Sequence, residues 1–214
     1  MLIAGNYLIM CDTNSKGEIK VNKQHNEVEV KYDVSDSYFE ILERIRKLGA
    51  IFQGGCVETT CRFDTNDKQL EANNIFLRVR RGFKNTITLK EKRKEDVGVK
   101  SRLETEFEIE DIEQMEYILS KIGFKYIRKM EKYRMTWLYN NAVITIDELP
   151  FGIYLEIEAA ESVIAHLASI LGIAEQFKIV HTYWDILTQI NAENNTYLEN
   201  IVFPDNYIYK LSKC

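Results

Sequence analysis

Apolar and polar side chains alternate along several short stretches of the chain. Val28 and Val30 are flanked by charged residues in NEVEVKY (26–32), and IFLRVRR (75–81) and NTITLKEKR (85–93) repeat this pattern. A period of two residues is typical of strands with one apolar and one polar face. Strands are therefore predicted at 25–33, 75–81 and 85–93, and further strands at 51–63, 101–110, 124–139, 142–147 and 152–159.

Three other stretches have apolar residues at helical spacing. Each follows a strand that contains Glu-x-Glu, and each is predicted to end at a glycine: Gly49, Gly123 or Gly172. A fourth, shorter helix is expected at 181–190. A helix with one apolar stripe must bury that stripe against an apolar sheet face. The strand residues best suited to cover the stripes are Val28, Val30, Phe107, Ile109, Leu155 and Ile157.

These patterns predict a mainly β protein of the α+β class, in which helices pack outside a curved sheet. About eight strands are enough to close a barrel, so the expected fold is a closed eight-stranded antiparallel β-barrel. If the helices cover the apolar outer face, the charged strand faces must point into the barrel.

Composition excludes several classes of protein. The 28 basic and 33 acidic residues leave a net charge of −5, so there is no global basic field of the kind that binds nucleic acid. The four cysteines form no C-x-x-C pair and there are three histidines, so neither a zinc site nor a disulfide framework is expected. No stretch resembles a membrane span or a signal peptide, and we therefore expect a cytoplasmic protein without a membrane partner.

The charged strand faces have two interpretations. Taken singly, an alternating charged strand is most often the solvated face of a sheet. Three acidic and three basic strands coincide here with three amphipathic helices, which favours an internal charged cavity. Ions inside a barrel are costly unless they are paired or bind a metal or a ligand.

The mixture of charges indicates what such a cavity would bind. Clustered carboxylates suit a hard cation such as Mg²⁺ or Mn²⁺, and guanidinium groups match the geometry of phosphate. A polyphosphate chelated by a divalent metal satisfies both sets, which indicates phosphoryl-transfer or phosphate-release chemistry. The carboxylates are Glu27, Glu29, Asp147, Glu156 and Glu158. The cations are Lys31, Arg78, Arg80, Lys90, Lys132 and Arg134.

Seven blocks of sequence also occur in the order typical of one protein family. The chain resembles CYTH-domain proteins, or triphosphate tunnel metalloenzymes, which include class IV adenylate cyclases, thiamine triphosphatases and inorganic tripolyphosphatases. The blocks are EVEVK, FLRVR, TLK, SRLETEFEI, KYRMTW, VITIDELPFGIYLEIE and TYWDIL. The resemblance covers residues 25–190, leaving an N-terminal extension (1–24) and a C-terminal tail (191–214).

The resemblance implies a role for each charged position. Glu27, Glu29, Glu156 and Glu158 would hold Mg²⁺ or Mn²⁺ in a two-metal site, assisted by Asp147. The residues that would grip a triphosphate substrate are Lys31, Arg78, Arg80, Lys90, Lys132 and Arg134. A mid-chain acidic pair, Glu104 and Glu106, would bind metal or orient the substrate. Family members often form dimers, so a homodimer is compatible with the resemblance.

Within this family, the sequence blocks most resemble those of class IV adenylate cyclases. In that reading the 3′-hydroxyl of ATP attacks the α-phosphate and expels pyrophosphate, with Asp147 assisting. The alternative is a triphosphatase acting on tripolyphosphate, thiamine triphosphate or a nucleoside triphosphate, in which Lys31 or Lys90 acts as the base for water. A non-catalytic module that binds polyphosphate or nucleotide is a second alternative.

Overall fold

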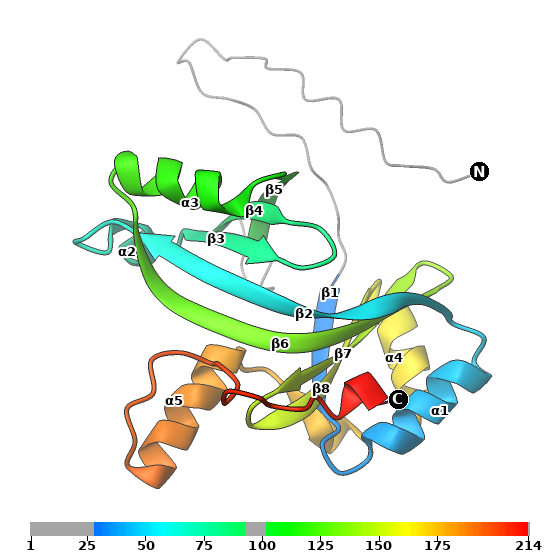
Figure 1. The fold of residues 1–214 in the computed structure, drawn as a ribbon. Helices are drawn as coiled ribbons and strands as arrows, with labels where there is room; N and C mark the ends of the chain where they lie inside the picture. The colour runs from blue at the N-terminus through cyan, green and yellow to red at the C-terminus, as the bar shows by residue number, and fades with distance from the viewer. Residues whose placement is uncertain (1–27, 93–101, 214) are drawn as a thin grey trace.

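The structure is a computed structural model that describes residues 28–92 and 102–213 (Figure 1). Its strands are β1 (Val28–Asp33), β2 (Ile51–Asp64), β3 (Phe76–Arg81), β4 (Thr86–Lys92), β5 (Arg102–Glu108), β6 (Lys125–Tyr139), β7 (Ala142–Leu149), β8 (Gly152–Ala159) and β9 (Lys178–Ile179). Its helices are α1 (Tyr38–Lys47), α2 (Gln69–Ala72), α3 (Ile112–Lys121), α4 (Glu161–Ile170) and α5 (Tyr183–Asn194), with 3₁₀ turns at Glu175–Phe177 and Leu211–Lys213.

The strands form one antiparallel sheet in the order β5-β4-β3-β2-β6-β7-β8-β1-β9. The mainly β, α+β class is confirmed, and the eight expected strands are all present. The prediction of a closed eight-stranded barrel is wrong, because no pairing among the described residues joins β5 to β1 or β9. The unforeseen strand β9 pairs instead with the edge of β1 that closure would need, at Lys31 and Tyr32.

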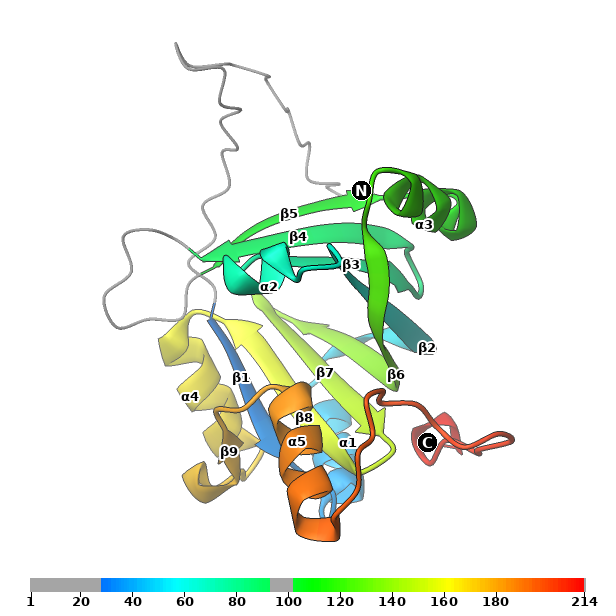
Figure 2. The same cartoon turned by 90° about the vertical axis from the view of Figure 1, so that its left-hand side faces the viewer.

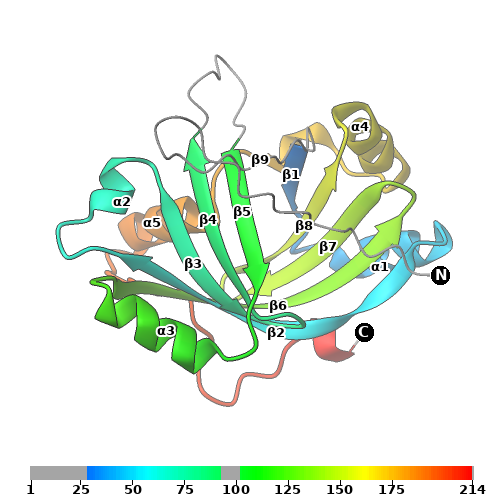
Figure 3. The same ribbon diagram turned by 90° about the horizontal axis from the view of Figure 1, so that it is seen from above.

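The open sheet is strongly curved. Seen from above, β3, β4 and β5 lie opposite β1 and β8 across a concave face (Figure 3). The long strands β2 and β6, of 14 and 15 residues, run through both halves. A bulge interrupts their pairing between Phe52 and Gly54, and Gly54 has a φ of 127°. A Cβ at this position would lie 2.7 Å from the ring of Phe83, so only glycine fits.

Helices α1 and α4 cover the convex face of β1, β7 and β8. Leu155 and Ile157 are fully buried there, as predicted, against Ile45 of α1 and Leu167 of α4. Helix α3 packs separately on β2 and β3. Phe107 is 47% exposed and contradicts its predicted role, because β5 is an edge strand beyond the area that α3 covers.

The glycines predicted to end three helices do so. Gly49, Gly123 and Gly172 follow α1, α3 and α4 with φ values of 79°, 100° and 64°. This left-handed conformation lets the chain leave a helix while satisfying its last carbonyl groups, and glycine adopts it without a Cβ penalty. The glycine that follows each of these helices is therefore explained by the backbone conformation that it adopts.

Helix α5 and the tail after it pack against residues of β6, β7 and β8. The helix packs on Leu149, Tyr154 and Ile201, and Figure 2 shows it beside β1 and β8. Beyond the helix, Ile201 bridges to Met130 of β6. The buried carboxylate of Glu148 accepts hydrogen bonds from the Tyr207 hydroxyl and from the backbone N–H groups of residues 210 and 211. The tail is thus an integral part of the packed structure.

Candidate functional site

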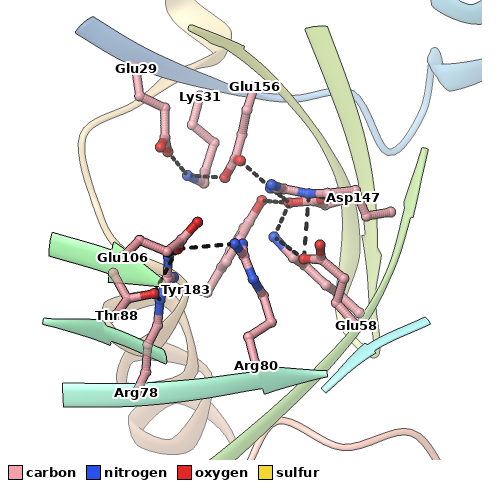
Figure 4. Close-up of polar contacts among 12 residues, drawn as sticks. Glu29, Lys31, Glu58, Arg78, Arg80, Thr88, Glu106, Asp147, Glu156 and Tyr183 are labelled. Atoms are coloured by element: carbon pink, nitrogen blue, oxygen red, sulfur yellow. Dashed lines mark hydrogen bonds and ion pairs between the residues drawn. The ribbon is translucent and has the colours of Figure 1, made fainter. Parts of the chain in front are cut away.

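The charged strand residues gather on the concave face, opposite the face that α1, α3 and α4 cover. Backbone pairing places Lys31 beside Glu156 and Arg134 beside Asp147. Side chains from β1 and β8 point toward those from β3 (Figure 4). The predicted residues on this face are Glu29, Lys31, Arg78, Arg80, Lys90, Glu104, Glu106, Lys132, Arg134, Asp147, Glu156 and Glu158. Glu27 lies outside the residues that the structure describes.

Asp147 is the centre of what we call the buried cluster: Lys31, Lys132, Arg134, Asp147 and Glu156. The Asp147 side chain has no exposed surface. Its Oδ2 lies 2.9 Å from Lys132 Nζ, and Arg134 donates through Nε and Nη2 to its two oxygens at 2.6 Å each. A buried carboxylate is stable only when paired and hydrogen-bonded, and Asp147 meets this condition with two cations.

Glu156 joins Lys31 to the rest of the buried cluster. Its Oε1 lies 2.5 Å from Lys31 Nζ, and its Oε2 accepts a hydrogen bond from Arg134. Lys31 also donates to Glu29 at 3.2 Å, and the Glu29 side chain is 51% exposed. Alternating charges therefore run from the exposed edge of β1 to the buried centre at Asp147.

Charge compensation within the buried cluster is reflected in its protonation. Burial disfavours the Arg134 charge, but Asp147 and Glu156 outweigh burial and raise the pKa of Arg134 well above its ordinary value. Burial would likewise raise the pKa of Glu156, but Arg134 and the neighbouring lysines hold that pKa well below its usual range. The pKa of Lys31 is raised because Glu156 and Glu29 together outweigh burial. These groups stay ionised as a pre-formed network.

Tyr183, the first residue of α5, was not predicted as a site residue. Its hydroxyl donates to Asp147 Oδ2 at 3.1 Å, and Lys31 Nζ lies 4.5 Å from the ring centroid. Burial and the Asp147 charge raise the pKa of Tyr183 well above its ordinary value, which keeps the hydroxyl a donor. Thr182 and Asp185 form a capping box that fixes the helix start. The sequence signals this start but not its placement against Asp147.

Glu58 of β2 is the second residue missing from the predicted set. Its Oε2 lies 3.5 Å from Lys132 Nζ and 3.8 Å from Arg134 Nε. The alternation of Glu58, Thr60 and Arg62 is a signal that could have placed it on the charged face. The neighbouring apolar and glycine residues of 51–57 hid that alternation.

A second group of charges, the open cluster, lies across the concave face on β3, β4 and β5. It consists of Arg78, Arg80, Lys90, Glu104 and Glu106. Glu106 is shared by two arginines, with its Oε2 at 3.8 Å from Arg78 Nη2 and 3.3 Å from Arg80 Nη2. Thr88 also donates to Glu106, at 2.7 Å, and Lys90 Nζ lies 2.5 Å from Glu104 Oε1.

Two cations of the open cluster, Arg78 and Lys90, have a lowered pKa. Burial, reinforced by the Arg80 charge, lowers the pKa of Arg78. Burial and the Arg78 charge lower the pKa of Lys90, against the opposing effect of Glu104. A cation whose pKa is lowered gains from any added negative charge nearby. Arg78 and Lys90 are therefore placed to bind an anion.

Four buried side-chain atoms in the part of the chain that the structure describes lack a hydrogen-bond partner. By strand register, each belongs to the concave face. They are Glu58 Oε2, Arg62 Nε, Thr86 Oγ1 and Thr145 Oγ1. Unused hydrogen-bonding capacity is costly in a buried place, so this face is suited to a polar ligand or to water.

The described residues contain no group of three or more Asp, Glu, His or Cys side chains arranged to hold a metal ion. Glu29 and Glu158 are register partners on β1 and β8, and both are at the exposed edge of the concave face. Their carboxylates are hard oxygen donors of the kind that Mg²⁺ and Mn²⁺ prefer. In residues 28–92 and 102–213, no helix is long and apolar enough to cross a membrane.

Solved structures share this fold. The PH1012 protein from Pyrococcus horikoshii is 27% identical, with a TM-score of 0.62, covering 74% of this chain and 98% of its own. A Hippeastrum protein, HpAC1, is 17% identical with a TM-score of 0.56, covering 80% of this chain and 96% of its own. HpAC1 is described as a "putative adenylyl cyclase" with a dominant triphosphatase activity. At that identity the likeness concerns the fold alone.

Sequence comparison supplies the family. A Methanocaldococcus jannaschii protein named "Putative adenylate cyclase" is 28% identical over 170 residues, which are 79% of this chain and 91% of that protein. The family described as CYTH domain matches residues 25–183, and this match includes every predicted site residue. The resemblance noted from the sequence blocks is thereby confirmed, and this chain belongs to the CYTH domain family.

Proposed function

We propose that this chain is a metal-dependent enzyme that binds the triphosphate of ATP on its concave face and converts ATP to cyclic AMP and pyrophosphate. The observation that carries the proposal is the loose pairing of Arg78, whose ion pair with Glu106 is 3.8 Å long, whereas Arg134 of the buried cluster donates two 2.6 Å bonds to Asp147. A polyphosphate supplies negative charge in a form that guanidinium groups bind well. The choice of ATP follows the name of the M. jannaschii relative.

In this proposal the residues of the concave face have two roles, phosphate binding and the positioning of other side chains. Arg78, Arg80 and Lys90 bind the phosphates, while Asp147 holds Lys132 and Arg134 in place without touching the substrate. The ribose 3′-oxygen bonds to the α-phosphorus, the bond from the α-phosphorus to the bridging oxygen breaks, and pyrophosphate leaves. The hydroxyl proton passes to solvent, because Lys31 has a raised pKa and Lys90 is cationic when the phosphates are bound.

The divalent metal expected in this family would be held at the exposed edge of the site. Five of the predicted metal ligands accept bonds from cationic or hydroxyl side chains: Glu29, Glu104, Glu106, Asp147 and Glu156. Glu29 and Glu158 fit best, because both are exposed and lie opposite each other in the register of β1 and β8. When bound, Mg²⁺ or Mn²⁺ would neutralise charge on the triphosphate.

A triphosphatase is the second candidate, because the same cations would bind a triphosphate whichever of its ends reacts. In this reaction water attacks the terminal phosphorus, the bond from that phosphorus to the bridging oxygen breaks, and orthophosphate is released as the water proton passes to solvent. Inorganic tripolyphosphate, thiamine triphosphate and nucleoside triphosphates are the candidate substrates of this reaction. The two reactions differ in which end of the triphosphate meets the nucleophile.

Incubation with ATP, tripolyphosphate and thiamine triphosphate, each with Mg²⁺ or Mn²⁺, tests the proposal. Cyclic AMP with pyrophosphate is the expected result, and orthophosphate would support the triphosphatase. Glu29→Ala should abolish turnover, whereas Glu113→Gln on the outer surface of α3 serves as a matched control. Binding of all three compounds without any product would overturn both reactions and leave a binding module.

A further inference from the structure

Glu58 presents a buried carboxylate oxygen with unused bonding capacity. Oε2 lies in the middle of the concave face, with Lys132 Nζ at 3.5 Å and Arg134 Nε at 3.8 Å, yet it accepts no hydrogen bond (Figure 4). The Glu58 side chain is 12% exposed. A buried carboxylate oxygen without a bond is costly, and such groups in native sites usually meet a ligand or water.

The two neighbouring cations form ion pairs with Glu58, but their hydrogen bonds go to other carboxylates. Lys132 donates to Asp147 at 2.9 Å, and Arg134 donates to Asp147 through two nitrogens and also to Glu156. The positive charge of these residues still surrounds Glu58 and keeps an ionised carboxylate tolerable in this place. What Glu58 lacks is a donor that points at Oε2.

The chemistry of Oε2 limits which part of a substrate can lie against it. Ionised phosphate oxygens are acceptors only, so a carboxylate repels them and forms no hydrogen bond with them. A hydroxyl or amino group can donate. In its fully ionised form inorganic tripolyphosphate carries no such group, whereas the ribose of a nucleotide carries two hydroxyls next to the triphosphate.

We propose that Glu58 accepts a hydrogen bond from a ribose hydroxyl of the substrate and so selects nucleoside triphosphates over inorganic tripolyphosphate. This inference rests on the proposed binding of a triphosphate to the concave face. It adds to that function a specificity-determining residue on β2, apart from the cations that bind phosphate. Gly82 supports the arrangement, because a Cβ there would lie 3.3 Å from Glu58 Cγ and press on the side chain.

Calorimetric titration tests the proposal with ATP, 2′-deoxy-ATP, 3′-deoxy-ATP and tripolyphosphate, with EDTA present to prevent turnover. In the unmodified protein one of the two deoxy analogues should bind about 10- to 100-fold more weakly than ATP, the effect of losing a hydrogen bond to a charged group. In Glu58→Met this difference should vanish, and the preference for ATP over tripolyphosphate should fall by the same factor. The amide oxygen of Glu58→Gln can still accept a hydrogen bond. This variant should therefore retain part of the difference between ATP and the deoxy analogue and part of the preference for ATP over tripolyphosphate.

The ratio of affinities is the decisive readout because removal of a negative charge strengthens binding of every polyphosphate. Equal changes for ATP and tripolyphosphate in Glu58→Met, with the deoxy effect intact, would overturn the role of Glu58 while leaving the proposed function standing. If the unmodified protein binds neither compound, the proposed function itself fails. Urea unfolding of both variants, with Glu113→Gln as a control, verifies that each remains folded.

Discussion

The two clusters on the concave face each contain three cations and two carboxylates, but they pair these charges differently. In the buried cluster, Asp147 has no exposed surface and bonds to Lys132, Arg134 and the Tyr183 hydroxyl. In the open cluster, Glu106 is shared between Arg78 and Arg80 at 3.8 and 3.3 Å. The lining of charges is therefore not uniform: the bonds to Asp147 are short and shielded from solvent, and the ion pairs of Arg78 and Arg80 with Glu106 are longer.

This contrast predicts that the largest loss of stability comes from the centre of the buried cluster. Asp147→Asn removes the charge that Lys132 and Arg134 share, and breaking such a buried pair should lower the free energy of unfolding by about 3–5 kcal/mol. Glu104→Gln, on the partly exposed edge of the open cluster, should cost about 1 kcal/mol or less. Urea titrations of both variants measure the difference, and equal losses would remove the distinction between the clusters.

Ligand affinity should show the opposite dependence. Arg78→Met removes a phosphate-binding guanidinium, and the affinity for tripolyphosphate should fall about 10- to 100-fold, as for one or more charge-assisted hydrogen bonds. The free energy of unfolding should change little, because burial already works against the Arg78 charge. Arg81→Met is the matched control, since Arg81 lies on the same strand but pairs with the exposed Glu113. Calorimetry that found the two variants alike would contradict the proposed site.

A smaller effect is expected where α5 meets the buried cluster. Tyr183→Phe removes the 3.1 Å hydrogen bond to Asp147 but keeps the ring beside Lys31, and it should lower the free energy of unfolding by about 1 kcal/mol. Tyr197→Phe, at a tyrosine that is 89% exposed, should have no measurable effect. If thermal or urea unfolding gives both variants the same free energy of unfolding, the Tyr183 hydroxyl does not stabilise the buried cluster.

The smallest effect is the uptake of a fraction of a proton on binding. The free protein has a lowered Lys90 pKa, so at a pH between that value and the ordinary 10.5 part of this lysine is neutral. A bound polyanion raises the pKa, and Lys90 then takes up a proton, with little uptake at lower pH where it is already charged. Calorimetry in buffers of different ionisation enthalpy measures the uptake. Lys90→Met should abolish it, and proton release instead of uptake would contradict the assignment.

Much of the site could be predicted because alternation is a local property of a strand. A period of two determines which side chains share a face, whatever the rest of the chain does. Lys31, Asp147 and Glu156 were therefore placed together correctly from the sequence. The same reasoning placed Leu155 and Ile157 against the helices, where they are buried.

Residues that reach the site from other kinds of element had no such signal. Tyr183 comes from the start of α5, and the position of a helix end depends on long-range packing that includes Leu149 and Ile201. Glu58 lies on a bulged strand whose glycines weaken the alternation. Phe107 shows that the face of a strand does not determine burial. The alternation placed Phe107 on the apolar face, but it is exposed because α3 does not extend over the edge strand β5.

The sequence by itself thus determined the faces of the strands, the ends of the helices and the family of the chain. Only the tertiary structure decided that the sheet stays open among the described residues, since that depends on which edge β9 pairs with. It also decided which charges are compensated, because compensation varies with distances of a few ångströms between strands far apart in the chain. Alternation states which way a side chain points, and the folded structure sets which partner it meets.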